Sequence, residues 1–276
     1  MTFAWKKGAP RVVFITGGGS GIGREFARRL AQEGGSVAIF NRRLAPTVVE
    51  ELQTLARSPS QRFSSFAADV MDEAALRHAF AEAAAQLGSP QLIINSAGII
   101  VSSPFAELSA DDFERVVRVN LIGSRNTSAA ALPYLSPGSH LVLVASLAGL
   151  LGNYGYAAYS ASKFGVVGLA RVLDIELSLL GVDVSVCCPG VILTPMVQAE
   201  HEVEHPLTRA LAEFPGVLDV ETACRGMLRG IARRRFEIGV GLLPRLTAWG
   251  YRHAPGFMRP LSHLLTRWYA RRLRTR

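Results

Sequence analysis

The chain has 276 residues, of which 49% are hydrophobic and 19% are charged, a composition that excludes an intrinsically disordered chain. This length suits one large α/β domain and is short for two. The formal net charge is +8, yet residues 225–276 hold 13 arginines and one acidic residue, Glu237, while the rest of the chain is net acidic. An acidic body without a nucleic-acid motif argues against nucleic acid as a partner, and the basic tail favours anionic lipid.

The three cysteines, Cys187, Cys188 and Cys224, lack the spacing of a zinc site or of a disulfide framework, and the six histidines show no metal-ligand spacing. We therefore expect no metal site and a reducing compartment. The first apolar strand begins about ten residues into the chain, which leaves no room for a signal peptide. No apolar run is long enough to span a membrane, so a cytoplasmic protein is predicted.

Short apolar runs alternate along the chain with longer helical patterns. Strands are predicted at residues 11–16, 36–40, 62–68, 91–94, 140–146, 182–188 and 236–240. Helices are predicted at residues 22–33, after Pro46, and at 72–87, 109–135, 156–180 and 221–235. This alternation predicts parallel strands joined by right-handed crossovers, which is an α/β fold with a doubly wound, Rossmann-type sheet. Ligands of such a sheet bind at the carboxyl ends of its strands.

We expect a single dinucleotide-binding and catalytic domain over residues 1–240, followed by a basic helical arm over residues 241–276. Residues 195–220 mix histidine, glutamate and proline and are predicted to form a mobile flap. One helical face of residues 260–276 carries Leu261, Leu264, Leu265 and Trp268. An apolar stripe with arginines around it is typical of a helix at an anionic membrane surface, and docking on the protein body or on a partner subunit is the alternative.

The first predicted strand runs directly into the glycine-rich turn TGGGSGIG at residues 16–23. Glycines allow a tight turn and a close approach of the backbone to a pyrophosphate, and the N-terminus of the following helix offers free N–H groups to it. A tight strand-to-helix turn without a ligand is the alternative. The residues expected to bind a dinucleotide here are Gly17, Gly19, Ser20, Gly21, Ile22 and Gly23.

The second predicted strand ends at Asn41, which Arg42 and Arg43 follow. An acidic residue at this point binds the ribose 2′-hydroxyl of NAD and repels a 2′-phosphate. Asn41 stands there instead, and the arginine guanidinium group suits a phosphate. NADP(H) is therefore the favoured cofactor, and the alternative is that both arginines are merely solvated surface residues.

The most informative segment is YSASK at residues 159–163, in which Tyr159 and Lys163 lie on the same helix face. A neighbouring ammonium group favours the phenolate, so we expect Lys163 to lower the pKa of Tyr159 toward neutrality and make it a proton donor or acceptor. Ser146, at the end of a predicted strand, is positioned to hydrogen-bond a substrate carbonyl group.

Together, these motifs resemble the short-chain dehydrogenase/reductase family over about residues 10–240. The family's glycine motif is matched by Thr16, Gly17, Gly21 and Gly23, and its adenine-flanking pair by Asp69 and Val70. Its N-N-A-G element is matched by Asn95, Ser96, Ala97 and Gly98, with serine in place of the second asparagine. Its catalytic asparagine is matched by Asn120, and its P-G-x-x-x-T motif by Pro189, Gly190 and Thr194.

The resemblance implies a role for each of these residues. Tyr159 would exchange a proton with the substrate oxygen, while Lys163 would hold the nicotinamide ribose and Ser146 would orient the carbonyl group. Asn120 would support a proton relay to Lys163, and Thr194 would meet the carboxamide of the nicotinamide. Asp69, Val70, Asn95, Ala97, Gly98, Pro189, Gly190 and Ile192 complete the expected cofactor contacts. Ser20 stands where many NADP-preferring relatives carry arginine or lysine, so that preference depends on Arg42 and Arg43.

The expected substrate is a bulky hydrophobic ketone or alcohol, because apolar residues cluster after Ser146 and at the start of the flap. They are Leu147, Leu150, Leu151, Tyr154, Tyr156, Pro195, Met196 and Val197, and burial in the core is the alternative for each. The flap region also resembles the lipid-handling branch with the 3-ketosphinganine reductases, which implies a long-chain 3-keto lipid. Dehydrogenation of a steroid-type or other hydrophobic alcohol is the alternative, and a non-catalytic cofactor-binding scaffold is a third reading.

The predicted helix at residues 156–180 is apolar on more than one face. Its apolar residues include Phe164, Val166, Val167, Leu169, Val172, Leu173, Ile175, Leu177 and Leu179. One face is needed to cover the sheet, and the remainder requires another cover. The family resemblance implies that this helix pairs with its copy in a homodimer or homotetramer.

Overall fold

The computed structural model describes residues 3–274 and contains a seven-stranded, fully parallel sheet in the order β3-β2-β1-β4-β5-β6-β9. The predicted doubly wound sheet is therefore confirmed. In chain order, its strands are β1 (Val12–Thr16), β2 (Ser36–Asn41), β3 (Phe63–Ala67), β4 (Leu92–Asn95), β5 (His140–Val144), β6 (Asp183–Cys187) and β9 (Glu237–Ile238).

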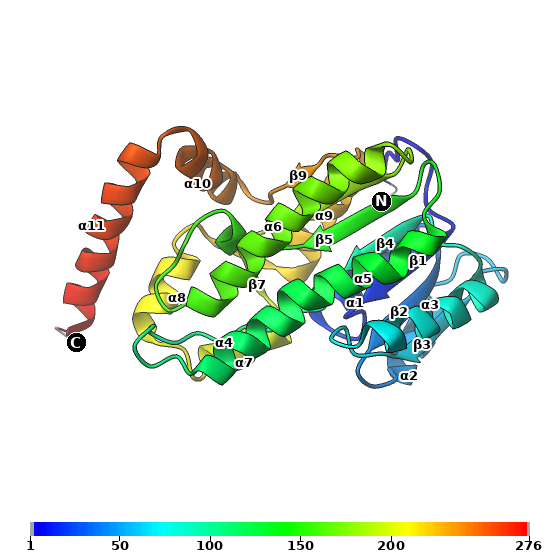
Figure 1. Cartoon of the computed structure of the whole chain (residues 1–276), viewed down its shortest axis with the longest axis horizontal. Helices are drawn as coiled ribbons and strands as arrows, with labels where there is room; N and C mark the ends of the chain where they lie inside the picture. Colours follow the sequence, from blue (N-terminus) through cyan, green and yellow to red (C-terminus); the bar gives the residue numbers. More distant parts are fainter. Residues whose placement is uncertain (1–2, 275–276) are drawn as a thin grey trace.

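Helices cover both faces of the sheet, as its apolar strands require. In β1, Val13 and Ile15 pack toward α1, α2 and α9, whereas Phe14 packs toward α3, α5 and α6. Helices α4, α5 and α6 lie in front of the sheet in Figure 1. The helices up to the last strand are α1 (Gly21–Gln32), α2 (Pro46–Thr54), α3 (Glu73–Leu87), α4 (Ala110–Val117), α5 (Gly123–Ala131), α6 (Ala157–Ser178), α7 (Pro195–His201), α8 (Pro206–Glu213) and α9 (Val220–Ala232).

The order of the strands reverses between β1 and β4, where Thr16 pairs with Asn95. Chain segments leave the carboxyl ends of these neighbouring strands in opposite directions, and the space between them is where a doubly wound sheet binds its ligands. The glycine-rich turn after β1 and the segment after β4 both begin at this point.

The single helix predicted at residues 109–135 is interrupted in the structure. Helix α4 passes through a π-helical turn, η1 (Arg118–Ile122), into α5, and a short 3-10 turn, η2 (Leu132–Tyr134), ends the run. Single π-helical turns within α-helices frequently mark functional sites. Here the turn contains Asn120.

The predicted flap, residues 195–220, has more regular structure than its sequence pattern indicated. Thr194 caps α7 by accepting a hydrogen bond from the Val197 backbone. Helix α8 begins at Pro206, and the side chain of the residue before it likewise accepts a backbone hydrogen bond. The flap ends in a strand that makes a separate two-stranded parallel sheet, of β7 (Val191–Leu193) and β8 (Val217–Asp219). Proline at the first helical position favours both short helices.

The C-terminal arm consists of two helices, α10 (Leu242–His253) and α11 (Pro255–Arg274). Helix α11 packs against α8, and it lies at one end of the molecule in Figure 1. The apolar stripe predicted for α11 is divided, because Leu261 and Leu265 face the body of the protein whereas Leu264 and Trp268 are exposed. Among the described residues, no helix is both long and apolar enough to cross a membrane.

Candidate active site

Two clefts meet at the carboxyl edge of the sheet. The first, which we call the cofactor cleft, is lined by the glycine-rich turn, by the segment after β4 and by α6. The second is a more apolar pocket between the residues after β5 and the segment 195–220. The clefts share five residues, which are Ile22, Ala145, Tyr159, Thr194 and Met196. Tyr159 therefore touches both spaces, as a residue that joins two reactants must.

The backbone of the glycine-rich turn packs too closely against its neighbours for side chains at two of its glycines. Gly17 has a positive φ of 69°, and a Cβ there would lie 2.7 Å from the Ala97 backbone nitrogen. A Cβ on Gly23 would lie 2.2 Å from the Gly17 carbonyl oxygen. Ser20 precedes α1 without capping it through its side chain, and no acidic residue lies in the first turn of α1. This helix end therefore suits an anion such as a pyrophosphate.

At the end of β2, Asn41 holds the glycine-rich turn. Its Oδ1 accepts a 2.8 Å hydrogen bond from the Gly19 backbone, and its Nδ2 is buried without a partner among residues 3–274. Arg42 and Arg43 are exposed directly after the strand, and neither makes an ion pair within that described range. Two free guanidinium groups beside an unsatisfied amide suit the phosphorylated ribose of a dinucleotide.

Three further residues that were predicted to contact the cofactor make hydrogen bonds within the protein. Asp69 accepts a 2.9 Å hydrogen bond from the Met71 backbone, and Val70 is buried with its carbonyl group bonded to Asn126. Asn95 is buried at the end of β4, where it accepts from Thr16 and donates to Ser124. Asn95 therefore joins β1, β4 and α5 beneath the cofactor cleft, with both of its amide atoms occupied.

Lys163 lies one helical turn after Tyr159 on α6, with its ammonium group 5.7 Å from the centre of the tyrosine ring. The Nζ atom donates a 3.0 Å hydrogen bond to the carbonyl oxygen of Val144, at the end of β5. Burial lowers the pKa of Lys163 to about 8. The ammonium group therefore loses its charge within the range of ordinary assays.

The pKa of Tyr159 differs from the sequence-based expectation. Burial raises it above its ordinary value, and a hydrogen bond with the Ser146 side chain only partly opposes that rise. Burial outweighs the nearby Lys163 ammonium group, which lies over the ring and donates its hydrogen bond to Val144. The phenol is thus protonated at neutral pH, the state needed in a proton donor to a carbonyl group.

Ser146 and Asn120 flank Tyr159 and Lys163 from other elements. The Ser146 hydroxyl caps the short turn η3 (Leu147–Gly149) by accepting a 3.2 Å bond from the Ala148 backbone, and Ser146 lines the apolar pocket. Asn120 is fully buried, and its amide makes two hydrogen bonds to the Ile99 backbone and one to Ser162. The Asn120 side chain therefore fixes the segment after β4 against α6.

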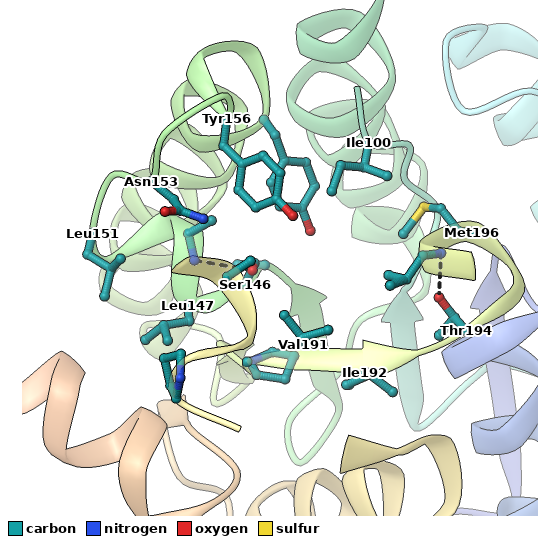
Figure 2. A pocket seen from close by; sticks show the side chains of 18 of the residues that line it. Ile100, Ser146, Leu147, Leu151, Asn153, Tyr156, Val191, Ile192, Thr194 and Met196 are labelled. Carbon is teal, nitrogen blue, oxygen red and sulfur yellow. Dashed lines mark hydrogen bonds between the residues drawn. The ribbon is translucent and has the colours of Figure 1, made fainter. Parts of the chain in front are cut away.

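The apolar pocket is open to solvent and is lined mainly by apolar side chains, as small-molecule sites commonly are. Figure 2 shows Tyr156 and Asn153 on one side of it, Ile100 and Met196 on the other, and Val191 and Ile192 along the strand below. Among residues 3–274, none that lines it is charged. The arrangement suits a molecule with one polar group near Tyr159 and a hydrophobic remainder.

The predicted residues divide between the two spaces. The cofactor cleft is lined by Gly17, Ser20, Gly21, Ile22, Ala97, Gly98, Tyr159, Lys163 and Thr194. The apolar pocket is lined by Ser146, Leu147, Leu151, Tyr156, Pro189, Gly190, Ile192, Met196 and Val197. Leu150 instead packs against the core, and Tyr154 lies outside this pocket. Gly19, Gly23, Asn41, Arg42, Arg43, Asp69, Val70, Asn95 and Asn120 line neither space.

Sequence reasoning missed several residues that line these clefts. In the cofactor cleft they are Ile99, Val144 and Ala145, and in the apolar pocket they include Ile100, Leu211, Ala212 and Pro215. Pro195, which was expected at the substrate pocket, lines the cofactor cleft instead. Ala145 immediately precedes the predicted Ser146, and adjacency to a strand end was a usable signal for it. Leu211 and its neighbours come from α8 and the turn after it. The position of α8 beside the pocket depends on tertiary packing, so its sequence pattern gave no signal for them.

A buried acidic group lies behind the tyrosines. Tyr156 donates a 3.0 Å hydrogen bond to the Glu204 carboxylate, and its ring meets the Tyr159 ring edge-on at 5.5 Å between centroids. Burial raises the pKa of Glu204, although the bond from Tyr156 opposes the shift. Through this bond, the segment 195–220 is attached directly beside Tyr159.

The model of one protein family, the short chain dehydrogenases, matches residues 11–205. A 3-dehydrosphinganine reductase of Arabidopsis thaliana is 31% identical over 264 residues, which covers 92% of this chain and 78% of the plant protein. A 3-ketodihydrosphingosine reductase of Bos taurus is 29% identical over 234 residues, which covers 83% of this chain and 70% of the bovine protein.

Two solved structures have a similar fold. A short chain dehydrogenase of Mycobacterium paratuberculosis bound to NAD superposes with a TM-score of 0.73 at 27% identity, covering 85% of this chain and 98% of that one. A short chain dehydrogenase of Burkholderia cenocepacia in complex with NADP also gives a TM-score of 0.73 at 26% identity. The superposition covers 83% of this chain and 95% of that one. Proteins of this fold therefore bind either nicotinamide dinucleotide.

Proposed function

The chain belongs to the short-chain dehydrogenase family, and on that premise we propose that it is an NADP(H)-dependent reductase of a bulky hydrophobic ketone, namely a long-chain 3-keto lipid such as 3-ketosphinganine. The observation that carries the proposal is the position of Tyr159, a half-buried, protonated phenol where the cofactor cleft meets an uncharged apolar pocket. The reverse oxidation of the secondary alcohol uses the same groups.

In this mechanism Tyr159 donates its phenolic proton to the ketone oxygen, which Ser146 holds by a hydrogen bond. Lys163 binds the ribose next to the nicotinamide through its ammonium group, while the glycine-rich turn and the start of α1 hold the pyrophosphate. When bound in the cofactor cleft, the nicotinamide would supply the hydride for the carbonyl carbon. Asn120 keeps the segment after β4 in place beside Lys163.

The choice of NADP(H) is supported by the residues after β2. Asn41 removes the acidic residue that would repel a 2′-phosphate, and Arg42 and Arg43 are exposed cations next to it. A charge-assisted contact to phosphate contributes about 1.5–3 kcal/mol.

The choice of a long-chain 3-keto lipid is supported by the apolar pocket and by the relatives that are named as reductases of sphingoid ketones. A steroid-type or other hydrophobic alcohol is the second candidate, because the lining excludes charge without specifying the shape of the carbon skeleton. A scaffold without catalysis is disfavoured by the presence of all four catalytic residues.

We also infer that the protein acts in the cytoplasm as a homodimer or homotetramer, with the arm attached peripherally to an anionic membrane face. The support is the exposed apolar surface on α6 and on the arm, together with the arginines of residues 225–276.

The proposal is tested by following oxidation of NADPH and of NADH with long-chain 3-keto lipids, steroid ketones and small ketones. We expect the highest kcat/KM for NADPH with a long-chain 3-keto lipid. A preference for a steroid ketone would replace the proposed substrate, and the absence of turnover with every ketone would refute the proposed activity.

A further inference from the structure

A second cavity, which we call the arm groove, lies next to the apolar pocket. It is bounded by the segment 151–154, by the end of α8 and by the two helices of the arm. The arm groove and the apolar pocket share Leu151, Asn153, Leu211 and Pro215. Because these four residues border both spaces, the arm groove and the catalytic pocket adjoin one another.

The lining of the arm groove is uncharged, although the arm itself is rich in arginine. Helix α11 contributes Met258, Leu261 and Leu265 to the groove, whereas Arg259 and Arg267 on the same helix are exposed. Residues spaced three and four apart share a helix face, so α11 directs an apolar face at α8 and leaves these charges outside. A charged or strongly polar ligand would gain nothing from such walls.

The apolar walls of the arm groove are not in full contact with one another. Phe214 remains exposed at the end of α8, and Leu261 and Leu265 are only half-buried although they face inward. Apolar surface that faces such a groove is stabilised when an apolar group covers it. Leu151 lines both spaces and Thr266 on α11 lines the arm groove, so a ligand that occupies both spaces must be extended.

We propose that the arm groove binds the distal part of a straight alkyl chain whose ketone end lies at Tyr159. The inference rests on the proposed function and extends it, because it makes the arm a wall of the substrate site and the element that selects for chain length. Residues such as Ser262 and Thr247, on the two arm helices, then limit how much chain the groove accommodates.

The proposal predicts that affinity rises with chain length, since each buried methylene improves binding roughly three- to fourfold. Binding of soluble straight-chain 1-alkanols of six to twelve carbons is measured by calorimetry with the full chain in the absence of lipid vesicles. In parallel, kcat/KM is measured for soluble straight-chain ketones of the same lengths with NADPH. Both series are expected to rise from the short to the long members.

The variant Ser262→Phe fills the groove, and His263→Phe is its matched control, because His263 is exposed on the same helix. Thr247→Phe fills the groove from α10 instead, so the test still applies if Ser262→Phe does not fold. We expect both filling variants to bind six-carbon alkanols within twofold of the parent and twelve-carbon alkanols at least tenfold more weakly, with no change in the control.

Equal affinity for all chain lengths, or equal effects of Ser262→Phe and His263→Phe, would overturn the alkyl site. Loss of all ketone reduction, with the chain-length effect on alkanol binding intact, would instead refute the proposed function and leave the alkyl site standing. The two failures are therefore distinguishable.

Discussion

The Lys163 ammonium group donates a hydrogen bond to the Val144 carbonyl oxygen across 3.0 Å, so α6 and the carboxyl end of β5 are joined at the wall of the cofactor cleft. Lys163 is fully buried there, and its pKa is about 8, below its ordinary value of 10.5. Below pH 8 the group is an ammonium ion that donates charge-assisted hydrogen bonds, and above pH 8 it is a neutral amine.

We therefore expect the affinity for NADPH to fall as the pH rises through about 8, by about fivefold, which corresponds to a loss of about 1 kcal/mol. The measurement is a fluorescence titration of NADPH from pH 6.5 to 9.5. The variant Lys163→Met should bind more weakly at every pH and show no inflection. An unchanged dissociation constant across this range for the parent would contradict the assigned role.

The proton donor is tested by Tyr159→Phe, which removes the phenolic hydroxyl and keeps the ring. The pKa of Tyr159 lies above its ordinary value of 10.0, so the phenol carries its proton at neutral pH, and general acid catalysis contributes on the order of 10²–10⁴-fold. We expect kcat to fall by that factor while the dissociation constant of NADPH stays within about twofold. Tyr134→Phe, on η2, should leave both values unchanged. Near-normal turnover by Tyr159→Phe would refute the mechanism.

Cofactor choice is tested by Arg42→Ala. Removing one charge-assisted contact to the 2′-phosphate should weaken NADPH binding by roughly ten- to over a hundredfold and leave NADH binding nearly unchanged. The exposed Arg57 gives the matched control, Arg57→Ala. Kinetic constants with both cofactors provide the measurement, and equal losses for NADPH and NADH would exclude Arg42 as the discriminating residue.

Much of the fold and of the catalytic centre was predictable because both are encoded locally. Apolar runs predicted every strand of the main sheet, and the spacing of Tyr159 and Lys163 required only one helix. The same local reasoning failed for the pKa of Tyr159. Its burial and the bond from Lys163 to Val144 depend on how α6 packs against β5.

The segment 195–220 and the arm were less predictable, since their structure depends on contacts between distant parts of the chain. The strand β8 exists only through pairing with β7, and the division of the α11 stripe depends on contact with α8. The periodicity of apolar residues shows which of them share a helix face. It does not show which part of that face is covered by another helix. Leu264 and Leu265 are adjacent in sequence and lie on opposite sides of that boundary.

Assembly is tested on the outer face of α6, where Ile175 is 72% exposed and Leu179 is 89% exposed. Val166 and Leu177 on the same helix are buried, so the helix has one covered and one uncovered apolar face. We expect light scattering at micromolar concentration to give at least a dimer, and Ile175→Asp to shift the mass toward the monomer. Val203→Asp, at an exposed valine outside α6, should not. A monomeric mass for the parent would exclude the predicted pairing.

The last prediction concerns the outward face of the arm, where Phe257, Leu264 and Trp268 are exposed. Arg267 and Arg271 are exposed on the same helix. Each basic residue near an anionic surface contributes about 1 kcal/mol, and an inserted leucine or tryptophan side chain adds to this. We expect the full-length protein to co-sediment with anionic vesicles at low salt, and high salt to weaken that binding because exposed charges are screened.

Deleting residues 260–276 should reduce sedimentation and the turnover of long-chain substrates while sparing a small soluble ketone, but this deletion also removes one wall of the arm groove. The double variant Leu264→Ser and Trp268→Ser changes only the outward face. It should lower vesicle binding at least tenfold and leave the binding of soluble alkanols unchanged, whereas Leu44→Ser, at an exposed leucine outside the arm, should alter neither. Parent protein that stays in the supernatant at low salt would show that the arm serves only to pack against α8 and close the groove.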